Sequence, residues 1–145
     1  MQLNKILVSV CGERTDDEIL RLAGRIARRS KAKVYVVYVI QVKRSLPLDA
    51  DMESETRKGE EVLDHAERVA QEQDYEIETE LLQARDIGPA IVDEAVERGV
   101  DLLIIGLNYK KPFGQFSLGE TIPYILKNAL SRVMVYREPM SEGIR

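Results

Sequence analysis

The residues best suited to ligand chemistry lie between Gly106 and Thr121, directly after a short apolar run. The run DLLIIG ends at Gly106, a polar and glycine-containing stretch follows, and a helix is then expected to open with SLGET at residues 117–121. The first amides of a helix lack helical partners and the helix dipole is positive there, so this end attracts anions. Loops that follow parallel strands are also where open α/β sheets bind ligands. The stretch 106–121 is therefore our candidate small-molecule site.

No residue set typical of an enzyme accompanies this stretch. The sequence contains no SxxK, GxSxG, HExxH or GxGxxG pattern. His65 is the only histidine, and its charged neighbours predict a surface position rather than a histidine-rich metal cluster. Cys11 is the only cysteine, and we interpret it as a small apolar filler rather than a redox thiol. We therefore expect a protein that is not an enzyme, with no catalytic residue and no metal ligand.

Composition and charge narrow the class of protein further. The chain has 145 residues and a net charge of −4, which argues against nucleic-acid binding because that function needs a basic surface. No run of 18 apolar residues is present, so we expect no insertion into a membrane. Met1 leads almost directly into the first expected strand, which leaves no room for a signal peptide and favours a cytoplasmic location. We expect one domain over residues 1–137 and a short polar tail over 138–145.

Strands and helices are predicted to alternate along the whole chain. Apolar and β-branched runs predict five strands, and apolar stripes at helical spacing predict four helices. The strands are expected at 3–10, 33–40, 76–84, 101–105 and 132–137, and the helices at 15–29, 51–73, 87–98 and 118–129. Such alternation implies parallel pairing through right-handed crossovers. The predicted fold class is α/β, a three-layer αβα sandwich with a mainly parallel five-stranded sheet.

Two helix starts carry the pattern of a capping box. In this pattern a serine or threonine caps the helix and an acidic residue three positions later reaches back to it. Thr15 and Glu18 fit the pattern at the first helix, and Ser117 and Glu120 fit it at the last. At the last helix, Glu120 would then place the chain's own negative charge where a phosphate would bind.

Other local signals concern helix boundaries and sheet edges. Asp86 is a candidate cap for the third helix, and Gly99 is expected to end it. Gly59 lies inside the second predicted helix and weakens the prediction that this helix is unbroken. Residues 76–84 alternate between apolar and acidic side chains, which is typical of a strand near a sheet edge. The apolar strand at 132–137 is a second candidate for an edge.

The stretch 106–121 resembles the C-terminal part of the universal stress protein family. Nucleotide-binding members of that family have a glycine, two residues, a glycine, nine residues, and then glycine with serine or threonine. Gly106 matches the first glycine and Gly119 the third, whereas Tyr109 stands at the second. Glu120 stands at the serine or threonine position, and Thr121 follows one position later. The segments ILVSV, VYVVYV and RVMVY extend the resemblance over nearly the whole chain.

The resemblance implies a fold, a site and partners. The family's fold is the same five-stranded, four-helix sandwich, which is Rossmann-like and related to the adenine-nucleotide α-hydrolases. Its ligand would be ATP or AMP, with Mg²⁺. Its partners would be a second copy of the chain through strand 132–137, and a regulatory protein or a membrane transporter. The site residues that it implies here are Val10, Cys11, Val39, Gly106, Asn108, Tyr109, Gly119, Glu120 and Thr121.

Three of these positions depart from the family's pattern. Cys11 replaces an aspartate that contacts the nucleotide, Tyr109 brings a large side chain, and Glu120 brings a negative charge. Each lost charge-assisted hydrogen bond is worth about 1.5–3 kcal/mol, so two losses would weaken binding roughly 10²–10⁴-fold. The leading hypothesis is a regulatory or interaction domain with a degenerate ATP site that is weak or lost. The alternatives are a true ATP- or AMP-binding regulator and, as the weakest, an ATPase or nucleotidyl-transfer enzyme.

Overall fold

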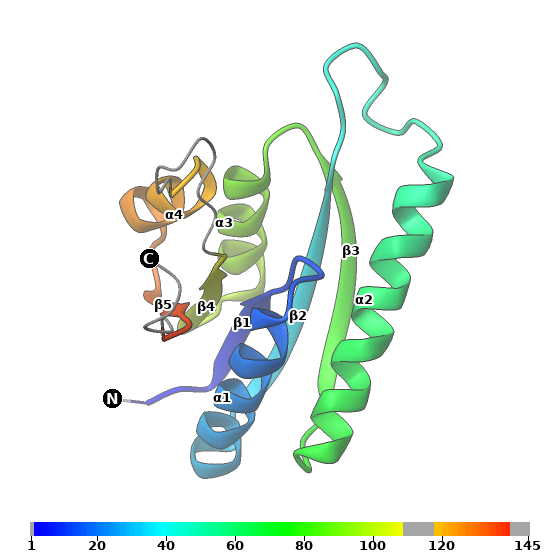
Figure 1. Cartoon of the computed structure of the whole chain (residues 1–145). Coiled ribbons are helices and arrows are strands. Elements are labelled where there is room, and N and C mark those ends of the chain that lie inside the picture. The colour runs from blue at the N-terminus through cyan, green and yellow to red at the C-terminus, as the bar shows by residue number, and fades with distance from the viewer. Residues whose placement is uncertain (1, 109–117, 140–145) are drawn as a thin grey trace.

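Strands and helices alternate strictly in the computed structural model, which describes residues 2–108 and 118–139. Figure 1 shows the chain coloured from the N-terminus to the C-terminus. The elements in order are β1 (Lys5–Ser9), α1 (Thr15–Ser30), β2 (Lys33–Gln41), α2 (Glu53–Glu72), β3 (Ile77–Ala84), α3 (Ile87–Arg98), β4 (Leu102–Leu107), α4 (Thr121–Asn128) and β5 (Arg132–Arg137). This order confirms the predicted alternation, and the bounds of α3 and β5 agree with those predicted from the sequence.

The five strands form one parallel sheet in the order β3-β2-β1-β4-β5. β1 lies at the centre, where Leu7 pairs with Tyr35 of β2 on one side and with Leu103 of β4 on the other. A central parallel strand is covered on both faces, which explains the unbroken apolar run of β1. The predicted parallel sheet is therefore confirmed.

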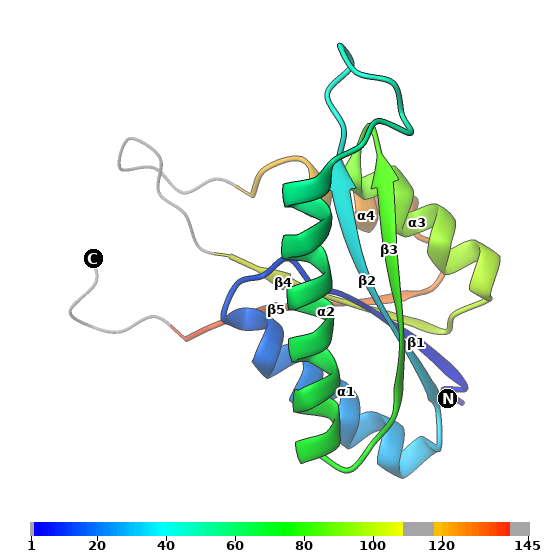
Figure 2. The ribbon, with the colours of Figure 1, turned by 90° about the vertical axis from the view of Figure 1, so that its right-hand side faces the viewer.

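Helices cover both faces of this sheet and make the three predicted layers. Helices α1 and α2 pack on one face, and α3 and α4 pack on the other (Figures 1 and 2). Each face of the sheet has its own hydrophobic core, and successive residues of β1 point into opposite cores. Ile6 faces α1 and α2, whereas Leu7 faces α3 and α4. Both side chains are at most 1% exposed. The αβα sandwich predicted from the sequence is the observed architecture.

The two outer strands are those whose sequences indicated an edge. β3 ends the sheet on one side, and its acidic residues Glu78 and Glu80 form ion pairs with Arg98 of α3. The Arg98 guanidinium also stacks on Tyr35, 4.4 Å from the ring centre. β5 ends the sheet on the other side, with four half-buried residues between Arg132 and Arg137. The alternating pattern of β3 therefore reflects a face that is partly open to solvent.

Helix α2 runs without a break past Gly59. A Cβ atom at this position would lie 2.6 Å from Leu81 Cδ1 and 2.8 Å from Tyr38 Cδ1, closer than real carbon contacts allow. Glycine is therefore needed here because the helix backbone approaches β2 and β3 closely, and it marks no break in the helix.

The capping box predicted at Thr15 is wrong. Arg14 occupies the N-cap position of α1 without a side-chain capping bond, and Thr15 is the first helical residue. The Thr15 hydroxyl donates instead to Asn108, and the Glu18 carboxylate accepts from Arg21. A hydrogen bond from Thr15 to a residue distant in the sequence has therefore replaced the expected local capping bond.

The last helix also begins differently from the prediction. α4 starts at Thr121 rather than near residue 118, with Glu120 at its N-cap position and no side-chain capping bond. Ser117, the other half of the predicted capping box, lies outside the described residues. At α3, Asp86 does occupy the N-cap position, but its carboxylate pairs with Arg44. Gly99 adopts the left-handed conformation after α3, with φ of 63°, which confirms the predicted stop.

Within residues 2–108 and 118–139, no helix combines the length and the apolar character required to cross a lipid bilayer.

Candidate functional site

A cavity of about 500 Å³ lies at the carboxyl ends of β1, β2 and β4. The chain passes from β1 to β2 and β3 on one side of the sheet, and then places β4 and β5 on the other. The order of the strands therefore reverses between β1 and β4, and open α/β sheets bind ligands at such a switch point. The starts of α3 and α4 close the cavity from one face of the sheet.

The structure brings eight of the nine predicted site residues together around this one cavity. They come from the ends of three strands and from the start of α4: Val10, Cys11, Val39, Gly106, Asn108, Gly119, Glu120 and Thr121. Tyr109 lies outside the described residues. That these residues bind a nucleotide stays a prediction.

Apolar side chains that the sequence analysis did not name as site residues form much of the cavity wall. Ile87 and Ile91 come from α3, Ile105 and Leu107 from β4, and Ile122 from α4. Sequence reasoning missed their role because their helical or strand spacing predicts burial without indicating which end of the core stays open. A wall of this kind suits a flat, mostly apolar ring system.

The backbone of β2 faces the cavity at Val39. β1 ends at Ser9, opposite Val37, and the Val10 amide still donates to the Val37 carbonyl at 3.0 Å. Backbone groups alternate sides along a strand, so the N–H and C=O of Val39 point the same way as those of Val37. The chain leaves the sheet at Cys11 and Gly12, so Val39 presents one donor and one acceptor toward the space that β1 has vacated.

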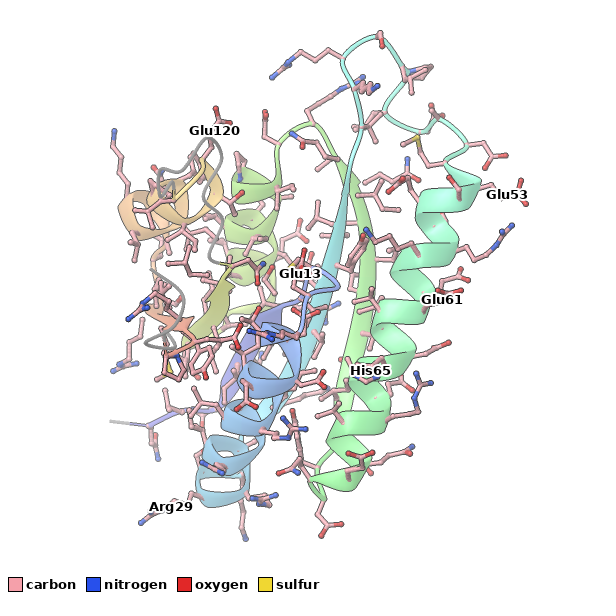
Figure 3. All side chains as sticks on the ribbon, in the orientation of Figure 1. Glu13, Arg29, Glu53, Glu61, His65 and Glu120 are labelled. Carbon is pink, nitrogen blue, oxygen red and sulfur yellow. The ribbon has the colours of Figure 1, made fainter. Side chains whose placement is uncertain are left out.

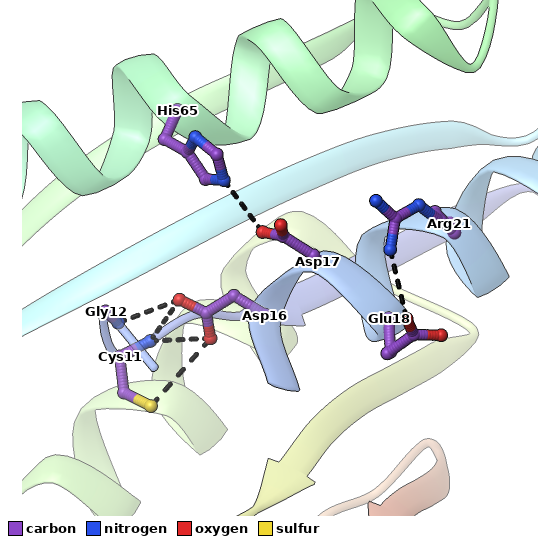
Figure 4. A network of polar contacts seen from close by, with 7 residues as sticks. All are labelled: Cys11, Gly12, Asp16, Asp17, Glu18, Arg21 and His65. Atoms are coloured by element: carbon purple, nitrogen blue, oxygen red, sulfur yellow. Dashed lines mark hydrogen bonds and ion pairs between the residues drawn. The ribbon is translucent and has the colours of Figure 1, made fainter. Parts of the chain in front are cut away.

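The turn between β1 and α1 holds a carboxylate that the sequence analysis did not single out. Asp16 is only 4% exposed, and it accepts the amides of Gly12 at 2.8 Å and Cys11 at 3.1 Å (Figure 4). Gly12 has a φ of 86°, which lets both amides point toward the carboxylate. Burial raises the pKa of Asp16, while the two amide bonds act in the opposite direction. The turn therefore has the geometry of an anion-binding loop, and the Asp16 carboxylate takes the place of the anion.

The interpretation of Cys11 as an apolar filler is wrong. Cys11 is exposed and lines the cavity, with its sulfur accepting from Asn108 Nδ2 at 3.0 Å. The sulfur also lies 3.8 Å from Asp16 Oδ1. Partial removal from water, followed by the negative charge of Asp16, raises the pKa of the thiol. A raised pKa keeps the thiol protonated and makes Cys11 a poor nucleophile at neutral pH.

Gly106 and Asn108 join the end of β4 to the first turn of α1. Thr15 Oγ1 donates to Asn108 Oδ1 at 2.5 Å. A Cβ atom at Gly106 would lie 3.1 Å from Thr15 Oγ1 and 3.3 Å from Thr15 Cβ. The first glycine of the family pattern therefore has a packing role in this chain that is independent of any ligand.

The opposite end of the cavity is acidic. Glu120 is exposed beside the first turn of α4, and Gly119 before it has a φ of 67° that favours glycine (Figure 3). A neighbouring cavity of about 420 Å³ shares Glu120 and Thr121 with the main one and is also lined by Asp86. The described residues around the main cavity include no lysine, arginine or histidine.

His65 and its partners lie away from this cavity. The His65 ring contacts the Asp17 carboxylate at 2.8 Å and bridges α2 to α1 (Figure 4). Its side chain is 48% exposed, as predicted for a surface residue. Within the described part of the chain, no group of three histidine, cysteine or acidic side chains is arranged to hold a metal ion.

Comparison with known proteins identifies the family. A model of the universal stress protein family matches residues 2–137. A universal stress protein of Methanocaldococcus jannaschii, MJ0531, is 31% identical over 144 residues, covering 95% of this chain and 84% of the relative.

Solved structures of two further proteins share the fold. A universal stress protein of Archaeoglobus fulgidus in complex with dAMP has a TM-score of 0.73 and 23% identity, covering 93% of this chain and 98% of that one. A family protein of Arabidopsis thaliana with AMP bound has a TM-score of 0.68 and 18% identity, covering 94% and 92%. From the family match and the curated relative, this chain belongs to the universal stress protein family.

Proposed function

We propose that this chain is a non-enzymatic regulatory domain that binds an adenine-containing ligand in the cavity at the ends of β1, β2 and β4. The observation that carries the proposal is the backbone of Val39, which presents a donor and an acceptor at the mouth of an apolar cavity. Family membership adds support, as do the dAMP and AMP complexes of the two structural neighbours.

Adenine fits these groups through hydrogen bonding and burial together. Its N6 amino group donates and its neighbouring N1 accepts, which matches the C=O and N–H of Val39. The aliphatic walls at Ile91 and Ile105 would cover the ring and remove it from water. Guanine carries an acceptor at O6 and a donor at N1, so it would leave both backbone groups of Val39 unpaired.

Titration calorimetry with adenosine and guanosine tests this proposal. We expect adenosine to bind at least about tenfold more tightly than guanosine, because each unpaired buried polar group costs about 1–3 kcal/mol. Equal affinity for the two nucleosides would contradict the assignment of the base site. The absence of binding by any adenine compound at millimolar concentration would overturn the proposed function itself.

The cavity chemistry supports binding rather than catalysis. The described lining residues include no histidine or lysine to act as a general base, and the Cys11 thiol is held protonated. Binding of the ligand would instead change how the chain interacts with a partner, which would be a regulatory protein or a membrane transporter. Steady release of phosphate from ATP and Mg²⁺ by the purified protein would contradict this part of the proposal.

A second candidate function is an ordinary ATP-binding regulator that holds the phosphates at the start of α4. Gly119 keeps the backbone conformation expected before such a helix, and the Thr121 hydroxyl lies at the cavity wall. In that case ATP with Mg²⁺ would bind more tightly than adenosine. The same calorimetric series therefore distinguishes the two candidates.

We also propose that two copies of the chain form a homodimer through β5. This strand lies at the edge of the sheet, with β4 on one side, and its four central residues are only half buried. An apolar edge strand of this kind favours pairing with a second copy. Light scattering after size-exclusion chromatography should give twice the chain mass of 16.5 kDa, and a strict monomer at micromolar concentration would contradict the dimer.

A further inference from the structure

We infer that the cavity prefers an uncharged adenine nucleoside to phosphorylated nucleotides, and that Glu120 is the residue that sets this preference. The inference rests on the proposed function, because it concerns the same cavity and the same base site. It adds a ligand class to that function and assigns a specificity-determining residue to the helix end of the cavity.

Charge around the cavity is the first observation behind this inference. Among the described residues that line it, Glu120 is the only charged one. Nucleotide phosphates carry negative charge that a binding site usually neutralises with lysine, arginine or a metal ion. Here the charge of the Glu120 side chain at the cavity wall has the same sign as the charge of phosphate.

The position of Glu120 strengthens the effect. It occupies the N-cap position of α4, where the unpaired amides and the helix dipole would otherwise favour a bound anion. The carboxylate itself therefore lies next to this favourable position. A phosphate that approached the start of α4 would meet both the carboxylate charge and a site whose positive potential is already offset.

A further set of backbone donors, described in the turn after β1, is occupied by a carboxylate of the chain. The amides of Cys11 and Gly12 converge as an anion-binding loop, but the buried Asp16 carboxylate accepts both of them. A phosphate would have to displace the carboxylate of Asp16, which belongs to the first turn of α1 directly after these amides. Among the described residues, the start of α4 and the turn after β1 therefore each carry a carboxylate of the chain beside their amides.

Nearby described cations face a different part of the molecule. Arg14 and Lys58 line a separate groove between α1 and α2, together with the acidic residues Glu13, Asp17 and Glu61. Arg14 is also paired with Glu138 at 3.1 Å. Neither of these cations lines the cavity that Glu120 borders.

Calorimetric titration with adenosine, AMP and ATP in the absence of Mg²⁺ tests the inference on the whole chain. We expect affinity to fall in that order, with adenosine about 10- to 100-fold tighter than ATP, from like-charge repulsion at a partly solvated site. Raising the salt concentration from about 0.05 to 0.5 M should narrow the gap, because salt screens repulsion between exposed charges.

Glu120→Gln keeps the size of the side chain and removes its charge. We expect this variant to bind ATP at least about threefold more tightly while its adenosine affinity stays within about twofold of wild type. The matched control is Glu67→Gln, an exposed position on α2, which should change neither affinity. Glu120→Ser is a second test variant that retains a helix-capping side chain, and it should behave as Glu120→Gln does.

The possible outcomes separate this inference from the function on which it rests. ATP binding as tight as adenosine in the wild type would overturn the nucleoside preference and leave the adenine site standing. Equal changes in ATP and adenosine affinity on Glu120→Gln and Glu120→Ser would overturn the assignment to Glu120. Failure of every adenine compound to bind would overturn both the inference and the proposed function.

Discussion

The two ends of the cavity present different chemical groups, backbone donors and acceptors at one end and a carboxylate at the other. At the strand end, Val39 contributes backbone groups that a parallel sheet leaves open where its central strand stops. At the helix end, the Glu120 carboxylate lies beside the first amides of α4, and at the turn after β1 the Asp16 carboxylate accepts the amides of Cys11 and Gly12. The comparison teaches that one cavity can present open backbone groups at one end and a carboxylate of the chain beside a helix start at the other.

Two kinds of contact hold the cavity wall in place. The strand end is fixed by the β-ladder and by core residues such as Ile105, which is 7% exposed. The link from the end of β4 to the end of β1 and the start of α1 depends instead on side-chain bonds that join Asn108 to Cys11, 97 residues away, and to Thr15. Substitutions at Val39 should therefore affect the ligand most, whereas those at Gly106 and Thr15 should also affect stability.

The largest expected effect is the loss of ligand binding in the Val39→Trp variant, which alters the strand end of the cavity. The indole would fill the part of the cavity that faces the β2 backbone, so binding of adenosine and ATP should fall at least about 100-fold alike. Val39→Ile adds one methylene and should keep affinity within about threefold. Calorimetry on both variants checks this, and full adenosine affinity in Val39→Trp would place the ligand elsewhere.

A substitution at Gly106 should break the link between β4 and α1. The new Cβ of Gly106→Ala would press on Thr15, and such overpacking costs about 1–3 kcal/mol of unfolding free energy. Thr15→Ala removes the atoms in contact, so the glycine substitution should cost less in that background. Urea unfolding of the two single variants and the double variant measures this coupling, and additive effects would show that Gly106 has no packing role.

The Thr15 hydroxyl should contribute less than the glycine. Thr15→Val keeps the shape of the side chain but leaves Asn108 Oδ1 without its donor, which should cost about 1 kcal/mol of stability. The affinities for adenosine and ATP should fall together, since this bond positions the cavity wall without contacting a phosphate site. Ser30→Ala removes an exposed hydroxyl at the far end of α1 and serves as the control, with a cost below about 0.5 kcal/mol. A selective loss of ATP binding in Thr15→Val would contradict this role.

The smallest effect concerns the pH dependence of stability from Asp16. Burial raises its pKa above the ordinary value of 3.8, so the folded state holds this proton more strongly than the unfolded state does. Unfolding then releases protons, and higher pH favours the unfolded state. The free energy of unfolding of the wild type, relative to Asp16→Asn, should therefore fall as pH rises from about 4 through the raised pKa. Urea midpoints of both proteins across this range provide the test, and a difference that grows with pH would reverse the sign.

The sequence was sufficient for the features that rest on local patterns. The apolar run of β1, the stop at Gly99 and the alternation in β3 each reflect burial or backbone conformation at one place in the chain. The parallel pairing of the strands also followed, because strands that alternate with helices are joined by crossover connections. Eight residues of the cavity were identified through the family pattern, since that pattern marks the ends of strands and the start of a helix.

Long-range side-chain choices could not be read from the sequence. Thr15 has a local capping pattern, yet its hydroxyl donates to Asn108, 93 residues away, because β4 lies beside the first turn of α1. Asp16 is one residue further along and has no sequence signal beyond an acidic helix start, although the left-handed Gly12 aims two amides at it. Cys11 was misjudged because its partner Asn108 belongs to another strand end.

The most direct test of the account is an amide NMR titration of the ¹⁵N-labelled protein with adenosine and then with ATP. We predict that adenosine shifts the amide signals of Val10, Val39 and Ile105, which surround the strand end of the cavity, while signals from α2 stay unchanged. ATP should produce the same pattern only at higher concentration. Shifts centred on another part of the fold, or no shifts with millimolar adenosine, would contradict the claim that this cavity is an adenine site.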